Sequence, residues 1–315
     1  MKTLPVLFLM AFSLGSYAQS YWYSDDYNPI RKAADYLQFA PDARSVGTGE
    51  SGSASSPDIF SMYWNPAKYA FFEDRFGIAV SFSNYPWMKE MYMFSKDLDW
   101  TIGYDALHGC WKISDRSAVA FSFTYYKAFS DVTYLDEYGN ELGTFDPYDL
   151  NVDLAYSYRI SDVFSAAVAA RYIRSKFFPS GEFIQGVKAK NGNSFACDLA
   201  VYYQKPLSLG SGEGELRLGA GISNIGNKMS FLESDNNKLF IPTNLRFGAG
   251  FTYRLSDDHS LSCQLDANKL LVPTPPLYLR DSLGQPVYDD NGNPVSHDAC
   301  SAIESHHLRT PWERS

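Results

Sequence analysis

The sequence predicts an all-β protein, and within that class a transmembrane antiparallel β-barrel. Three observations predict this fold. Apolar and polar residues alternate with a period of two from about residue 75 onward, several alternating stretches are long, and long connections alternate with short ones. A strand places alternate side chains on opposite faces, and a membrane-spanning strand takes about 9–11 residues. Outer-membrane barrels join such strands by short turns at one end and long loops at the other.

Composition restricts the class of protein further. The chain has 315 residues, with 27 Lys and Arg against 36 Asp and Glu, and a net charge of -9. This acidic balance argues against nucleic acid as a partner, because phosphate binding needs a basic surface. Aromatic residues make up 16% of the chain, which suits strands. A mean hydropathy of -0.27 excludes a helical membrane protein but is compatible with strands that are apolar on one face.

The first eighteen residues are typical of a secretory signal peptide. Lys2 precedes a short apolar stretch from Leu4 to Leu14, and Ser16-Tyr17-Ala18 ends it with small residues at the cleavage-determining positions. We therefore expect residues 1–18 to be removed after Ala18 and the protein to be exported. The alternative is a buried N-terminal helix.

Nine strands are expected, and their two faces differ in kind. On the stretch 150–159, for example, Leu154 and Tyr156 share one face while Asp153 and Ser157 share the other. The expected strands are 75–82, 98–113, 118–125, 150–159, 163–178, 194–204, 215–223, 244–254 and 260–271. We expect the charges on the polar face to pair with one another or with the N-terminal segment, and the alternative is that they line an open conduit. Those charges are Asp153, Arg159, Arg171, Asp198, Arg217, Arg246 and Asp266.

The expected connections fall into two sets. The shorter ones, at 114–116, 161–162, 205–213 and 255–259, include turn sequences such as Ser161-Asp162. The longer ones lie at 85–97, 130–148, 179–193 and 226–240. Four aromatic residues in the long connections are candidates for contact with a partner: Tyr134, Tyr138, Phe145 and Phe183. The alternative is that these rings only pack the loops onto one another.

Residues 19–74 show no alternation. Gly47 to Gly52 matches the glycine spacing of a dinucleotide site, but that site needs a preceding strand and a following helix. Pro41 stands before the glycines and Pro57 after them, so we expect a tight glycine-bent segment and no cofactor. The motif residues of this segment are Asp42, Arg44, Gly47, Gly49, Gly52, Trp64, Asn65 and Pro66.

The string from Pro41 to Ser45, continued by Trp64-Asn65-Pro66-Ala67-Lys68, resembles the N-terminal hatch of the PorV family of the type IX secretion system. The strings 222–226, 241–246 and above all 268–276 agree with the resemblance. It implies a barrel of about fourteen strands, with a hatch at residues 19–74 in its lumen. It also implies a cell outer membrane location, in contact with lipid.

The resemblance implies a function without chemistry. Proteins of the family bind the C-terminal β-domain signal of secreted cargo, associate with the translocon and pass cargo to the sortase attachment complex. We expect no enzyme, no metal site and no catalytic residue. Two other hypotheses stay open, a transporter for hydrophobic small molecules and, less favoured, a lipopolysaccharide deacylase.

The end of the chain departs from the family pattern. Nine strands is an odd number, whereas bacterial single-chain barrels have an even one, and residues 296–315 show no alternation. We therefore expect the barrel region, 75–295, to be incomplete. The tail at 296–315 is expected to reflect a truncated or misread end, and an unusual natural C-terminus is the alternative.

Overall fold

The structure is a computed structural model that describes residues 30–84, 103–127, 129–136, 138–184, 186–209, 212–233, 238–256, 259–273 and 287–289. The chain divides into two units, and every helix and strand below belongs to the unit Arg31–Val272. The signal peptide expected at 1–18 and the tail at 296–315 lie outside the described residues.

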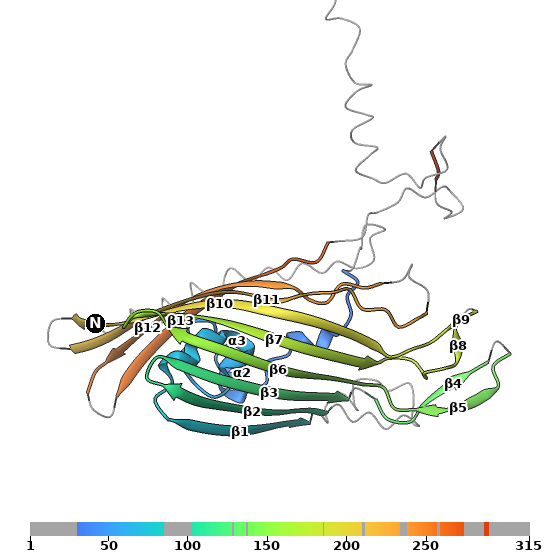
Figure 1. The fold of residues 1–315 in the computed structure, drawn as a ribbon, viewed down its shortest axis with the longest axis horizontal. Coiled ribbons are helices and arrows are strands. Elements are labelled where there is room, and N and C mark those ends of the chain that lie inside the picture. The colour runs from blue at the N-terminus through green and yellow to red at the C-terminus, as the bar shows by residue number, and fades with distance from the viewer. Residues whose placement is uncertain are drawn as a thin grey trace, which may run out of the picture. The chain divides into compact units, whose positions relative to one another are not determined.

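One antiparallel sheet of nine strands forms the larger part of this unit (Figure 1). Its strands follow one another in chain order, which confirms the all-β prediction and the nine strands expected from the alternation. In sheet order they are β1 (Phe76–Asn84), β2 (Gly103–Ser114), β3 (Ser117–Lys127), β6 (Tyr148–Arg159), β7 (Phe164–Lys176), β10 (Gly192–Leu209), β11 (Gly212–Gly226), β12 (Asn244–Arg254) and β13 (Ser260–Leu270).

The connection predicted at 205–213 is wrong. Strand β10 continues to Leu209 and pairs with β11 through Leu209↔Gly212, so most of that range is ladder. Pro206 belongs to this ladder, although proline cannot donate a hydrogen bond to a neighbouring strand. It lies beyond Tyr203, the last residue of β10 that pairs with β7. At that level the strand has a paired neighbour on one side only, and proline is tolerated there.

Two of the long connections, expected to be loops, contain short strands. Strands β4 (Val132–Leu135) and β5 (Glu141–Phe145) form one hairpin, and β8 (Phe183–Ile184) and β9 (Val187–Lys188) form another. Figure 1 shows both hairpins at the same end of the large sheet, which we call the loop end.

The sheet exposes its apolar face and buries its polar face, which is the reverse of the usual arrangement in a water-soluble protein. On β6, the Leu154 side chain is 64% exposed whereas its neighbour Asp153 is 2% exposed. The same contrast recurs on other strands, where Phe195 and Leu218 are exposed while Asp198 and Arg217 are buried. The outer face is therefore apolar and the inner face is polar, as the alternation predicts.

Residues 31–74, which we call the inner segment, cover the polar face. The segment forms only short helical turns: η1 (Asp35–Gln38), α2 (Ala43–Gly47), α3 (Ser61–Trp64) and η2 (Pro66–Phe71). Turn η2 contacts β6, β7 and β10, and α2 and α3 lie behind β6 and β7 in the view of Figure 1. Among the described residues, no helix has both the length and the apolar composition needed to cross a membrane.

Small and polar residues of the sheet hold the backbone of the inner segment closely. The Asp266 carboxylate accepts hydrogen bonds from the Gly52 and Ser53 amides at 2.9 and 2.8 Å. A Cβ at Gly219 would lie 2.0 Å from the Ser53 carbonyl oxygen, so only glycine permits this approach. Within the segment itself, the fully buried Lys68 amine donates to the Gly52 carbonyl and to the Ser55 hydroxyl, at 3.0 and 2.8 Å.

A charge network lies buried on the inner face around Arg171. Its Nε donates to Asp153 at 2.6 Å, and its Nη2 donates to Asp198 at 3.1 Å. The remaining Nη1 donates to the Asn224 side-chain oxygen, and the Asn224 backbone amide donates to the Asp198 carboxylate at 2.7 Å. Arg246 donates to the Tyr63 carbonyl of the inner segment at 2.6 Å. These charges thus pair with one another or with the inner segment, as expected.

Replacing Arg171 by methionine should lower the free energy of unfolding by about 3–5 kcal/mol, because two buried carboxylates lose their cation. The matched control is Arg254→Met. Arg254 pairs with Glu213 at 3.4 Å with both side chains exposed, so its loss should cost less than about 1 kcal/mol. Denaturant unfolding in detergent, followed by circular dichroism, measures both. Equal losses in the two variants would contradict a buried network.

The Lys68 amine provides a second test, through pH. Burial lowers its pKa from the ordinary value of 10.5. In the window between the lowered pKa and 10.5, the unfolded chain binds more protons than the folded one, so stability rises with pH. The native chain should therefore gain stability relative to Lys68→Met as pH increases from neutral toward 10.5. Parallel unfolding curves for the two chains across this range would show that the amine is not buried.

Candidate binding site at the loop end

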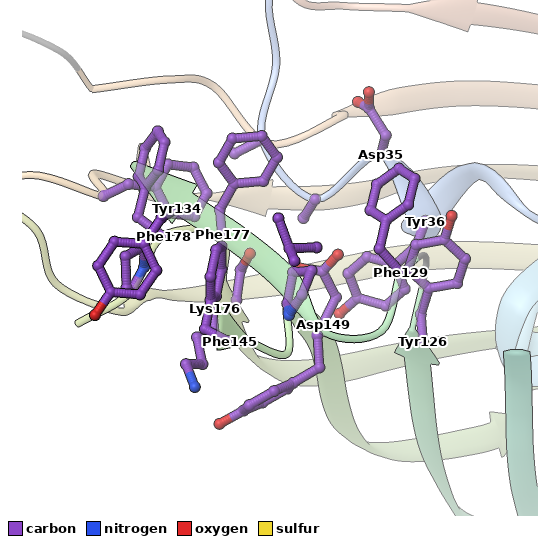
Figure 2. Close-up of a pocket in the computed structure, with 18 of the residues that line it drawn as sticks. Asp35, Tyr36, Tyr126, Phe129, Tyr134, Phe145, Asp149, Lys176, Phe177 and Phe178 are labelled. Atoms are coloured by element: carbon purple, nitrogen blue, oxygen red, sulfur yellow. The ribbon is translucent and has the colours of Figure 1, made fainter. Parts of the chain in front are cut away.

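A cavity of about 800 Å³ opens at the loop end of the sheet (Figure 2). It lies between the first turn of the inner segment, the ends of β3, β6 and β7, and the β4–β5 hairpin. Residues after β7 and in the connection between β11 and β12 complete the wall. Four separate stretches of chain thus build one site, and most of its lining is aromatic or aliphatic.

Stacked rings form the base of the cavity. Tyr36 of η1 stacks on Tyr126 of β3 with ring centroids 5.9 Å apart and an angle of 6° between the planes. Phe39 meets the same Tyr126 ring edge-on at 5.6 Å. Tyr36 is almost fully buried, so the inner segment supplies a fixed base rather than a mobile cover.

The walls are aromatic as well. Tyr134 of β4 and Phe145 of β5 meet edge-on, with centroids 6.2 Å apart. On another side, Phe177 and Phe178 follow β7 directly, and both rings contact Phe231 at 5.6 and 6.3 Å. Such offset and edge-on contacts are favourable for aromatic rings and hold the walls in place.

Few charged side chains line the cavity. Lys32 pairs with Asp35 at 2.9 Å, which leaves Lys176, Asp149 and Glu182 among the lining charges. Asp149 is at the start of β6, next to Ser175 of β7 in the strand register. The arrangement suits an occupant that is largely apolar.

The four loop aromatics predicted from the sequence do not share one place. Tyr134, Phe145 and Phe183 all line the cavity. Tyr138 is 82% exposed in the connection between β4 and β5 and does not line it. Tyr134 also contacts Phe145, so packing of loop rings onto one another and lining of a site occur together here. Contact of these residues with a partner stays a prediction.

The predicted motif residues of the inner segment lie away from the cavity and hold the segment together. Asp42 caps α2 by accepting from the Ser45 amide at 2.7 Å, and it accepts from the Trp64 indole at 3.0 Å. Asn65 caps η2 through the Ala67 amide and donates to the Ser53 and Val201 carbonyls. Pro66 occupies the first turn of η2, where its missing amide is no loss.

The arginine and glycines of the same motif have local roles. Arg44 pairs with Asp58 at 3.1 Å. Gly47 ends α2 instead of opening a helix, and Gly49 has φ 77°, a left-handed conformation that favours glycine. A Cβ at Gly52 would lie 2.2 Å from the Trp64 ring. These contacts match a glycine-bent segment. Among the described residues, no group of three His, Cys, Asp or Glu side chains could hold a metal ion.

Sequence reasoning missed several residues of the cavity. Phe177 and Phe178 stood at the end of an expected strand, and an aromatic pair next to a long connection is a signal that could have found them. Tyr36 carried no such signal, because its segment has no periodicity. Asp149 fell between the expected connection at 130–148 and the expected strand at 150–159, and nothing in the sequence shows that it meets a cavity.

Two comparisons with known proteins bear on identity. No curated protein matches the chain. The family model described as type IX secretion system protein PorV matches residues 23–277, and it covers the inner segment and all nine strands of the sheet. The chain therefore belongs to the PorV family and has a role in type IX secretion.

Proposed function

We propose that this chain is a noncatalytic outer-membrane protein of type IX secretion. It binds the C-terminal β-domain signal of secreted cargo and passes the cargo from the translocon to the sortase attachment complex. The observation that carries the proposal is the aromatic cavity at the loop end. Family membership gives the secretion role, and the cavity offers a place where a protein partner can bind.

The inverted faces of the sheet support the membrane location. Exposed Leu154, Phe195 and Phe247 belong to a large apolar outer face, and contiguous apolar surface of this kind marks contact with lipid or protein. A lipid environment accounts for the exposed apolar side chains on all of these strands together. In this arrangement the sheet is the described part of a barrel over residues 75–295, and the inner segment belongs to a hatch over residues 19–74.

The shape and chemistry of the cavity support binding of protein side chains. Its volume falls within the range of about 300–1,000 Å³ that is usual for binding pockets. Tyr134 and Phe145 come from the β4–β5 hairpin, and Phe183 comes from the β8–β9 hairpin. Aromatic anchors of this kind often dominate the binding energy of protein interfaces.

Transport of hydrophobic small molecules is the second candidate function, and the apolar lining of the cavity favours it. A transporter needs a route onward from the cavity. Beneath the cavity, the inner segment packs on the sheet, and the Arg171 network holds buried charge. Two further cavities near the inner segment measure only about 20 and 10 Å³. This packing favours a surface binding site.

Replacing Tyr134, Phe145 and Phe183 together by alanine should weaken binding of a purified cargo β-domain at least tenfold. The loss follows from removing aromatic anchors that are each worth more than about 1 kcal/mol when they act as hot spots. Surface plasmon resonance with the chain in lipid nanodiscs measures the affinity. Tyr138→Ala is the matched control and should change affinity little, because Tyr138 lies outside the cavity.

Two results would count against this function. If the β-domain binds the triple variant as tightly as it binds the native chain, the cavity is not the cargo site. If cargo reaches the cell surface with the triple variant while uptake of a hydrophobic compound fails, the chain is a transporter.

A further inference from the structure

Asp149 is a carboxylate without a cation in an aromatic cavity. Its side chain accepts a hydrogen bond from the Ser175 hydroxyl. The charged group that acts on it electrostatically is another carboxylate, Asp35. Lys32, one of the two lysines that line the cavity, pairs with Asp35 instead. Among the described residues, no Lys or Arg forms an ion pair with Asp149. Figure 2 shows Asp149 among the aromatic side chains of the cavity.

A carboxylate in such surroundings favours a positively charged occupant. Removing an ionised carboxylate from water is costly unless a cation or several donors replace the water. Tyr126 of β3 is opposite Asp149 in the strand register, and Phe129 also lines the cavity. Aromatic faces attract ammonium and guanidinium groups. The carboxylate and the rings therefore select for the same ligand group, an organic cation.

The apolar surface extends beyond the cavity, which favours a peptide over a small molecule. Leu135 and Leu142 on the β4–β5 hairpin are each 55% exposed, and Phe183, which also lines the cavity, is 72% exposed. A small cation would fill the base and leave this rim in water. A peptide segment with apolar side chains on either side of a basic one would cover both.

We propose that Asp149 makes the cavity a recognition site for a lysine or arginine flanked by apolar side chains, on a peptide segment of the cargo β-domain. The inference rests on the proposed function and adds the charge of the ligand and the residue that selects it. In the bound state, the cationic group lies against the Asp149 carboxylate and the neighbouring rings. The apolar side chains lie against the walls and rim.

The test compares matched peptides on the full chain in lipid nanodiscs. Two fluorescein-labelled peptides, Gly-Phe-Lys-Phe-Gly and Gly-Phe-Gln-Phe-Gly, differ only in charge, and fluorescence anisotropy gives their affinities. The lysine peptide should bind the native chain about tenfold more tightly, the size of a charge-assisted hydrogen bond. Asp149→Asn should abolish that preference. Glu182→Gln, which removes an exposed carboxylate from the rim, should keep it.

The other outcomes separate the inference from the proposed function. Equal binding of the two peptides to the native chain, or an unchanged preference in Asp149→Asn, overturns the role of Asp149. If the intact β-domain still binds in that case, the proposed function stands, and Asp149 has no part in recognising the cargo. Failure of the β-domain to bind the native chain contradicts the proposed function itself. If dodecyltrimethylammonium displaces the lysine peptide and binds more tightly than it does, the ligand is a small cationic amphiphile and the peptide assignment is wrong.

Discussion

The buried polar face of the sheet is the constraint on which the rest of this structure depends. A sheet that exposes leucine and phenylalanine while it buries Asp153, Asp198 and Arg171 must give each buried polar group a partner, because an unpaired one costs several kcal/mol. Arg171 joins the two carboxylates, and the inner segment supplies much of what remains. The segment has little regular secondary structure, so its own backbone groups need partners too. Asp266 and Ser157 of the sheet meet that need, which makes the segment and the sheet mutually dependent.

This dependence also shapes the loop end. The first turn of the inner segment belongs at once to the buried core and to the base of the cavity, since Tyr36 packs with Tyr104 and Ile173 and stacks on Tyr126. The amide of Ala33 donates to the Phe240 carbonyl at 2.8 Å, which ties the segment to the connection between β11 and β12. A partner that enters the cavity therefore meets a surface whose position is set by the interior. Rigid support of this kind keeps a binding site in a competent geometry before the partner arrives.

Sequence reasoning predicted the sheet well because alternation is a direct consequence of strand geometry. It found all nine strands, and its main error was the connection at 205–213, where β10 continues to Leu209 beyond the end of its pairing with β7. It failed to predict the β4–β5 and β8–β9 hairpins, whose strands are too short to show a period. The contacts of the inner segment were beyond its reach. Asp42 and Trp64 are 22 residues apart, and only the folded sheet brings Asp266 to Gly52.

For the candidate site, the sequence predicted three of the lining residues, Tyr134, Phe145 and Phe183, because aromatic residues in long connections are recognisable one by one. It could not predict that they share a cavity with Tyr36 and Asp149. That arrangement depends on how the inner segment lies under the loop end, and no local pattern records it. The residues that distinguish this site chemically were therefore the ones that the sequence concealed.

The most direct measurement of the central claim concerns what surrounds the sheet. Single nitroxide labels at Leu154, Val168 and Leu218, all exposed on the outer face, can be compared by electron paramagnetic resonance with a label at Tyr138 in lipid bilayers. The account predicts that oxygen, which concentrates in lipid, relaxes the three sheet labels more than a water-soluble nickel chelate does. It predicts the reverse at Tyr138. Strong relaxation of the sheet labels by the nickel chelate would show that water covers the outer face, and would contradict the account.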